Sequence, residues 1–439
     1  SVRVACAPGA SGSSSRTRAS LAIVAPSSRV QRWVSDTGWG GVLVSGTWPS
    51  LRTVTATSKV LPARALLGTP SHVTLVRQNS GASGSLTAGT ILSDVVLPAV
   101  TVYVDFPLER AVVRPIGAEL AARGCAVVET DDLEQPSELG LFACHPNRYF
   151  DFEAGAWRRP PSERAVLVLH DLGQDGAADA DYFAVDSWHK FDFGLLPGGR
   201  WADIWLRAKA RGLPGPSLGM HVVGYPRADH IWRDPEAHAA AARRVRAAAD
   251  PGDRIVLLLS CSWPNPAGLR DFCDAVDFDR YAALVRFPRV TNPDPGNPWY
   301  DRLRAGDDEM LETRALAESD PRLTVIDSAE DVMAVVAAAD VVVSNGSGTL
   351  YDAVVAGVPG ISVRSWMHPA GRYGEGTTPA RIDLEGVLSV ENLAALDQQV
   401  ALVRSPGWRP LLEVSGTRLV EPATRGRAAA LAADLVLSQ

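Results

Sequence analysis

The chain has 439 residues, 46% of them hydrophobic and 21% charged, which is typical of a globular protein with two or three domains. The formal net charge of −7 argues against general nucleic-acid binding, and no apolar run reaches the roughly 20 residues that span a bilayer. The five cysteines are scattered and form no CxxC pair, so neither a zinc site nor a disulfide framework is indicated. A reducing cytoplasm is the simplest setting for such a chain.

The first 98 residues differ in composition from the rest. They carry nine basic and two acidic side chains, a net charge of +7, which leaves −14 for the remainder. They are rich in Ser, Thr and Gly, with short β-like runs at 21–24, 41–44 and 72–76. We favour a small, strand-rich or partly disordered extension. A segment that mimics a transit peptide, and a basic arm that contacts anionic lipid at the inner face of the plasma membrane, stay open as alternatives.

From residue 99 onwards, strands and helices alternate. The sequence predicts a helix over 114–123 and strands at 100–106, 126–129, 165–170, 182–185 and 220–223. This alternation is typical of a parallel sheet covered by helices. His170 ends one of these strands, and Asp186 and Asp229 follow two others, at the sheet edge where open α/β folds bind ligands.

A second series of the same kind follows an alanine-rich helix at 237–249. Strands are predicted at 255–259, 281–287, 323–326, 341–343 and 360–363, and helices at 329–339, 390–403 and 425–438. We therefore expect an α/β protein with two Rossmann-like domains, 99–235 and 236–439, whose parallel sheets face each other across a cleft. The Ser- and Arg-rich extension 1–98 precedes them.

The segment 340–360 carries the clearest functional pattern. A valine run stops at a turn of small residues, and a helix ended by Gly357 follows; the turn is made of Asn345, Gly346, Ser347, Gly348 and Thr349. Unpaired amides and the helix dipole at such a place favour a phosphate, and the two hydroxyls can cap the helix or touch phosphate oxygens. Asp352 is placed to reach ribose hydroxyls. The alternative is an ordinary βα turn with serine caps.

Four segments resemble the GT-B glycosyltransferases, and most closely the CDP-glycerol glycerophosphotransferase family of teichoic-acid synthesis. They are 166–173, 224–229 (Gly-Tyr-Pro-Arg-Ala-Asp, like the family's Gly-x-Pro-Arg-x-Asp), 255–263 and 331–363. The last segment also resembles the UDP-GlcNAc-binding turn of MurG-type transferases and of UDP-GlcNAc 2-epimerases. The resemblance implies a GT-B fold and metal-independent catalysis. It implies no metal site and no cofactor besides the nucleotide-linked donor.

The chemistry requires a base and a phosphate-binding site. His170 suits the base because its pKa lies near neutral, and Asp171 or Asp186 either orients it or replaces it. The sequence departs from the family here, since His170-Asp171-Leu172 stands in place of His-Gly-Thr.

The donor nucleotide and its phosphates are expected to meet the glycine turn together with two loops. The expected contacts are Arg227, Ser262, Arg286, Asn345, Gly346, Ser347, Gly348, Thr349 and Asp352. Arg227 has a structural alternative, a pairing with Asp229 in its own turn.

Three functions stay open. The first is a transferase that moves a glycerophosphate-type or glycosyl group from a CDP- or UDP-linked donor to a cell-envelope polymer or glycan. The second is a UDP-GlcNAc 2-epimerase-like enzyme, and the third is a non-catalytic subunit that binds a nucleotide-sugar. Transfer to an acceptor, isomerisation without one, and binding alone distinguish the three.

Overall fold

The computed structural model of the chain describes residues 29–34, 40–45, 97–104, 107–143, 149–151, 156–169, 172, 188–262, 264–288, 298–366 and 384–439. The chain divides into two units, residues 1–79 and 80–439. In the first unit, β1 (Arg29–Val34) and β2 (Gly40–Ser45) form an antiparallel pair. The predicted run at 41–44 lies within β2, whereas those at 21–24 and 72–76 fall outside the described residues.

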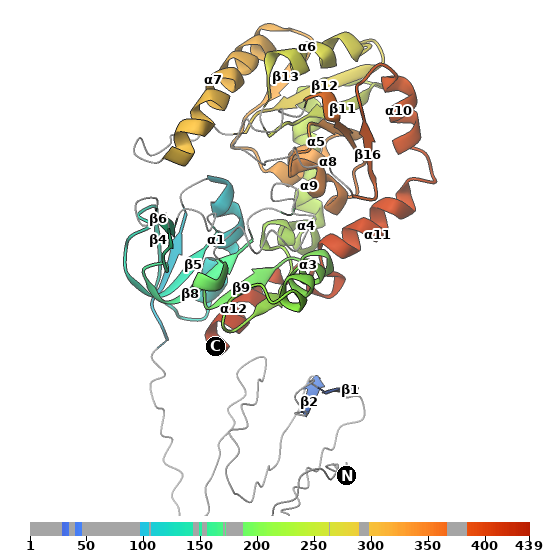
Figure 1. The fold of residues 1–439 in the computed structure, drawn as a ribbon. Helices are drawn as coiled ribbons and strands as arrows, with labels where there is room; N and C mark the ends of the chain where they lie inside the picture. The colour runs from blue at the N-terminus through green and yellow to red at the C-terminus, as the bar shows by residue number, and fades with distance from the viewer. Residues whose placement is uncertain are drawn as a thin grey trace, which may run out of the picture. The chain divides into compact units, whose positions relative to one another are not determined.

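The second unit contains two six-stranded parallel sheets (Figure 1). The first sheet has the order β10-β9-β8-β5-β3-β4. Its strands are β3 (Val100–Tyr103), β4 (Val127–Thr130), β5 (Ser137–Phe142), β8 (Ser162–Val168), β9 (Phe193–Leu196) and β10 (Met220–Val222). Numbered along the chain, this order is 2-1-3-4-5-6, with the arrangement of flavodoxin-like sheets over its first five strands.

The second sheet has the order β13-β12-β11-β14-β15-β16. Its strands are β11 (Ile255–Leu259), β12 (Tyr281–Arg286), β13 (Leu323–Ile326), β14 (Val341–Ser344), β15 (Gly360–Val363) and β16 (Val387–Val390). Numbered along the chain, the order is 3-2-1-4-5-6, that of dinucleotide-binding folds. The central strands are buried along nearly their whole length, as expected for a sheet with both faces covered.

Helices flank both sheets. Those before β11 are α1 (Pro107–Ala122), α3 (Gly199–Ala210), α4 (Asp229–Arg233) and α5 (Pro235–Ala248). Those after it are α6 (Pro266–Ala275), α7 (Pro298–Ser319), α8 (Val332–Ala337), α9 (Thr349–Val355), α10 (Leu396–Val403), α11 (Arg409–Leu419) and α12 (Ala428–Ser438). A short hairpin, β6 (Phe150–Asp151) with β7 (Ala156–Trp157), precedes β8. The described residues also form the 3-10 turns η3 (Trp188–Lys190), η4 (Pro226–Ala228), η5 (Arg364–Trp366) and η6 (Pro422–Thr424).

The C-terminal helix α12 packs against α1, which belongs to the first half of the unit. Arg123 donates to the backbone carbonyl of Ala430 and forms an ion pair with Asp434, both at 3.0 Å. One face of α12 is made of alanines and Val436, all fully buried in a core cluster that includes side chains of both sheets. The two halves are therefore joined by shared apolar packing as well as by the chain itself.

Side-chain caps begin three of the helices whose starts the structure describes. Asp234, Asn265 and Asp331 each accept a hydrogen bond from a backbone N–H in the first turn of α5, α6 and α8. In α5 and α6 a proline follows the cap directly, at the position where its missing N–H costs nothing. These caps set where the helices start.

The parallel sheets and most predicted elements agree with the sequence analysis, but the boundaries differ in places. The predicted helix at 390–403 begins only at Leu396, because 387–390 form β16 at the sheet edge. The helix predicted at 329–339 starts after the cap Asp331. Strands β5 and β9 were not predicted, and the predicted strand at 182–185 lies outside the described residues. The domain boundaries after residues 98 and 235 stay predictions. None of the described helices has the length and apolar character needed to cross a membrane.

Candidate functional site

The candidate site lies where the strand order of the second sheet reverses. Strands β11 and β14 are neighbours in the sheet. After β11 the chain continues to β12 on one side of this pair, whereas after β14 it continues to β15 on the other side. In open α/β sheets, the crevice outside the carboxyl ends of such a strand pair is the usual ligand site. The loops that follow β11 and β14 are 260–265 and 345–348. The glycine turn singled out from the sequence is therefore at the topological switch point.

The turn after β14 has a backbone that requires glycine at one position. Gly346 has φ +94°, a conformation that side chains with a Cβ rarely adopt. Ser347 Oγ accepts a hydrogen bond from the N–H of Thr349 and donates to Thr349 Oγ1, both at 3.2 Å. Within the part of the chain that the structure describes, the backbone N–H groups of 346–348 donate no hydrogen bond to another backbone group. Consecutive amides of this kind form a concavity suited to an anion.

Hydrogen bonds hold the two loops of the switch point together. Ser344 Oγ donates to the carbonyl of Ser260 at 2.5 Å, and the N–H of Ser262 donates to Asn345 Oδ1 at 3.1 Å. Ser260 Oγ and Thr349 Oγ1 lie 3.2 Å apart. These polar side chains are largely buried, which costs free energy unless they are paired. The loop geometry is consequently defined by side chains of both segments.

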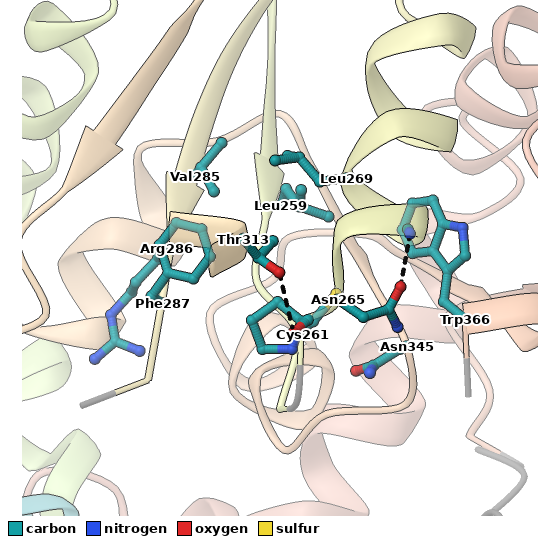
Figure 2. Close-up of a pocket in the computed structure, with 12 residues that line it drawn as sticks. Leu259, Cys261, Asn265, Leu269, Val285, Arg286, Phe287, Thr313, Asn345 and Trp366 are labelled. Carbon is teal, nitrogen blue, oxygen red and sulfur yellow. Dashed lines mark hydrogen bonds between the residues drawn. The ribbon is translucent and has the colours of Figure 1, made fainter. Parts of the chain in front are cut away.

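A pocket opens beside these loops (Figure 2). One part of its wall is apolar and one part polar; the lining residues are Leu259, Cys261, Pro264, Asn265, Gly268, Leu269, Val285, Arg286, Phe287, Thr313, Asn345 and Trp366. Arg286 ends β12 and Asn345 follows β14, so both expected donor contacts meet in this pocket. Arg286 also donates from Nη2 to the carbonyl of Ser328 at 3.4 Å, which holds its guanidinium near the end of β13.

Sequence reasoning missed Asn265 and Thr313 as pocket residues. The Asn265-Pro266 pair is a recognisable helix start, and Asn265 Oδ1 accepts from the N–H of Gly268 at 2.8 Å. Thr313 lies in the middle of α7 and gives no sequence signal. Its Oγ1 donates to the carbonyl of Glu309 at 2.6 Å and lies 3.5 Å from that of Pro264.

The thiol in the pocket wall is not a nucleophile at neutral pH. Burial raises the pKa of Cys261 to about 12, against weaker opposing hydrogen bonds from Asn345 and Ser344. A thiol with such a pKa stays protonated. The pocket therefore offers hydrogen bonds and one cation, Arg286, among the groups described.

Arg227 and Asp352 come together although 125 residues separate them in the chain. Arg227 Nη1 lies 3.6 Å from Asp352 Oδ2, and only 7% and 6% of the two side chains are exposed. The hydroxyl of Tyr225 donates to Asp352 Oδ1 at 3.3 Å and accepts from Arg227 at 3.4 Å. The Gly-Tyr-Pro-Arg-Ala-Asp segment of the first half is thus tied to helix α9, directly after the glycine turn.

Asp229 has a structural role. Its two carboxylate oxygens accept hydrogen bonds from the N–H groups of Ala428 and Ala429, at 3.0 and 2.8 Å, at the start of α12. Burial raises the pKa of Asp229, and the two backbone hydrogen bonds oppose that rise. The aspartate therefore caps the last helix, while its neighbour Arg227 forms an ion pair with Asp352.

The predicted catalytic residues His170, Asp171 and Asp186 all lie outside the described residues. The structure describes β8 and the buried Leu169 directly before His170, and the carbonyl of Leu172 directly after Asp171 accepts from Trp201 Nε1 at 3.1 Å. Their roles stay predictions.

The remaining described residues that are able to hold a metal lie away from this pocket's lining. His230, His238 and Asp331 each offer a ligand atom, and these atoms lie within 4.8 Å of one another. The sequence analysis predicted no metal site, as the resemblance to GT-B transferases implied, and it did not bring these three residues together.

The fold is like that of the wall teichoic acid polymerase TagF. A TagF variant soaked with CDPG for 15 minutes matches at 11% identity and a TM-score of 0.50, over 77% of this chain and 87% of that chain. The same variant after a 30-minute soak matches at 12% identity and a TM-score of 0.50, over 77% of this chain and 88% of that chain. This chain has a GT-B fold. At such low identity the likeness concerns the fold alone.

A UDP-GlcNAc 2-epimerase from Methanocaldococcus jannaschii, in complex with UDP-GlcNAc and UDP, matches at 10% identity and a TM-score of 0.40. The match covers 75% of this chain and 96% of the epimerase chain. That likeness is too distant to decide anything about this chain. No protein-family model and no curated protein matches the sequence.

Proposed function

We propose that this GT-B protein is a transferase that moves a glycerophosphate-type or glycosyl group from a CDP- or UDP-linked donor to a cell-envelope polymer or glycan. The observation that carries the proposal is the hydrogen-bonded pair of loops at the switch point of the second sheet. There the turn 345–349 and the pocket that contains Arg286 and Asn345 adjoin. The fold of TagF, whose structures were obtained with CDPG, supports a nucleotide-linked donor.

In this proposal the donor diphosphate meets the amides of 346–348. Arg286 supplies a positive charge at the same edge of the sheet, and Ser262 and Asn345 shape the loop beside it. Preorganised donors at this place stabilise the charge that develops on the departing nucleotide phosphate. Ser347 and Thr349 keep the turn in shape through their mutual hydrogen bonds.

Arg227 and Asp352 act together in the same proposal. Because Asp352 is almost fully buried against Arg227 and Tyr225, we assign it the positioning of that cation in addition to the ribose contact expected from the sequence. His170 takes the proton of the acceptor hydroxyl, and Asp171 or Asp186 orients it. These three assignments rest on sequence reasoning.

The first test is thermal unfolding of the full chain with CMP, CDP, CDP-glycerol, UDP and UDP-GlcNAc. Ligands that bind the folded state raise the melting temperature by mass action. We expect a shift with one nucleotide series, reduced in Arg286→Gln and Ser347→Ala. The matched control is Arg314→Gln on the exposed face of α7, where Arg314 pairs with Glu318.

The outcomes separate the candidate functions. A cytidine-specific shift with label transfer from CDP-glycerol to an acceptor supports a phosphopolyol transferase, and a uridine-specific shift with transfer supports a glycosyl transferase. Isomerised sugar without any acceptor would favour an epimerase. Binding without either reaction would favour a nucleotide-sugar-binding subunit. No shift with any nucleotide would overturn the proposed donor site.

A further inference from the structure

The segment that follows Tyr225 brings two histidines and an aspartate together at one place. His230 lies on α4, His238 on α5, and Asp331 caps the start of α8. Helix α5 packs against both α4 and α8 (Figure 1). His230 therefore lies before the predicted domain boundary at residue 235, and His238 and Asp331 lie after it.

The distances suit a shared cation. The three ligand atoms lie within 4.8 Å of one another, and His230 Nε2 lies 2.8 Å from Asp331 Oδ2. Ligand atoms about 2.05 Å from a tetrahedral zinc ion lie roughly 3.4 Å from one another. The ligand atoms that are farthest apart here would therefore have to approach each other by about 1.5 Å. The two imidazole rings have centroids 5.5 Å apart. Two imidazoles bound to one tetrahedral ion have centroids about 5.2 Å apart by the same geometry.

The surroundings of the ligands also resemble those of a metal site. Asp331 Oδ1 accepts from the N–H of Met333 at 3.3 Å, which orients the carboxylate and leaves Oδ2 toward His230. The His230 side chain also forms a hydrogen bond with the backbone of Arg227. Metal-binding histidines commonly use their second nitrogen in this way.

His238 supplies an independent observation. Its Nδ1 is shielded from solvent and has no hydrogen-bond partner among the residues that the structure describes. A buried ring nitrogen without a partner calls for an explanation, of which a bound ion is one. The site is accessible to an ion in solution, because 43% of the His230 side chain and 44% of the Asp331 side chain are exposed.

From this geometry we propose that His230, His238 and Asp331 bind one divalent transition-metal cation of the zinc type. Two neutral imidazoles and one carboxylate are a donor set that suits Zn²⁺ and Co²⁺, and a fourth position remains for water. The ion would link α4 and α5 to the start of α8. Arg227 lies only three residues before His230, so the ion would also hold the segment that carries the Arg227–Asp352 pair. The proposal does not depend on the proposed function, and the ion takes no part in the transfer chemistry.

The test is metal binding by the full chain after removal of metals with EDTA. We expect one Zn²⁺ per chain by calorimetry and the visible absorption of four-coordinate Co²⁺ when Co²⁺ is added. Zn²⁺ in hundredfold excess over its Kd should raise the melting temperature by about 5 °C. His238→Gln and Asp331→Asn should each weaken Zn²⁺ binding at least about tenfold.

Two matched variants make the test specific. His221→Gln changes an exposed histidine that contacts the carbonyl of Leu218, and Asp327→Asn changes a loop aspartate whose Oδ1 accepts from the N–H of Ala329. Both should bind Zn²⁺ like the wild type. If His238→Gln has a lower melting temperature than the wild type in EDTA, its Zn²⁺ affinity is not used. The Zn²⁺ affinity of Asp331→Asn is then compared with that of Asp327→Asn to test the proposal. Wild-type protein that binds no stoichiometric ion, or cluster variants that bind as tightly as the controls, would overturn the proposal.

Discussion

Replacing Arg227 by methionine should strongly destabilise the protein, because Arg227 faces Asp352 in a buried place. Arg227 Nη1 and Asp352 Oδ2 are 3.6 Å apart, and both side chains are more than nine-tenths shielded from solvent. At an effective dielectric constant of about 20, two unit charges at this distance attract each other by about 5 kcal/mol. The variant keeps the length of the side chain but leaves the buried carboxylate without that cation. Removing one partner of a buried pair typically costs about 3–5 kcal/mol.

The assay is thermal unfolding of the full chain at neutral pH. Taking about 2 °C per kcal/mol, the low end for domains of 150–250 residues, we expect the melting temperature to fall by roughly 6–10 °C. Arg409→Met is the matched control, because Arg409 forms an exposed i,i+4 pair with Glu413. Exposed pairs of this kind contribute little, so the control should melt like the wild type.

A double variant tests the cause. Arg227→Met combined with Asp352→Asn removes both charges, and Tyr225 can still donate to the amide oxygen. The double variant should therefore lose less stability than the sum of the two single variants. A melting temperature of Arg227→Met equal to that of Arg409→Met, or additive losses in the double variant, would refute the reasoning.

Three further outcomes are expected. Gly346→Ala should cost about 1 kcal/mol or more by thermal unfolding and reduce nucleotide-induced stabilisation, because Gly346 has φ +94°; Gly348→Ala, at φ −51°, should be close to neutral. The hydrogen bond to Asp331 raises the pKa of His230 above its usual 6.5, so its stabilisation is complete below pH 6.5 and disappears as the pH rises through the raised pKa. In EDTA, the melting temperature of the wild type relative to His230→Gln should follow that course, and a pH-independent difference would contradict it. Cys261, with a pKa of about 12, should resist alkylation at pH 8 in the folded protein and react after unfolding, as followed by mass spectrometry of its peptide.

Many strands and helices of the fold were predictable from local sequence patterns. The strands at 255–259, 323–326 and 360–363 were predicted with their observed bounds, because each is a short apolar run bounded by turn residues. The strand at 387–390 was not predicted, and its last residue was included in the helix predicted at 390–403, since a four-residue run at a sheet edge has too little periodicity to reveal its partner. Strands β5 and β9 were missed because each has a glycine in its interior, Gly140 and Gly194, which lowers the strand signal, whereas Gly360 is only the first residue of β15.

Part of the candidate site was likewise predictable from the sequence, and part was not. The glycine turn was visible in the sequence because its residues are consecutive. Its place beside Ser262 and Arg286 depends on strand order, which sets β14 next to β11 rather than next to β13. Local pattern does not encode which strands become neighbours.

The sequence by itself determined two βα series, a phosphate-suited turn at 345–349, and a basic N-terminal segment, because each is written in adjacent residues. Only the tertiary structure decided three pairings: Arg227 with Asp352, Asp229 with the start of α12, and His230 with His238 and Asp331. These contacts join residues up to 200 positions apart. The first two form because packing of the two halves buries their polar groups, and a buried polar group is costly without a partner. The third forms because α5 packs against both α4 and α8.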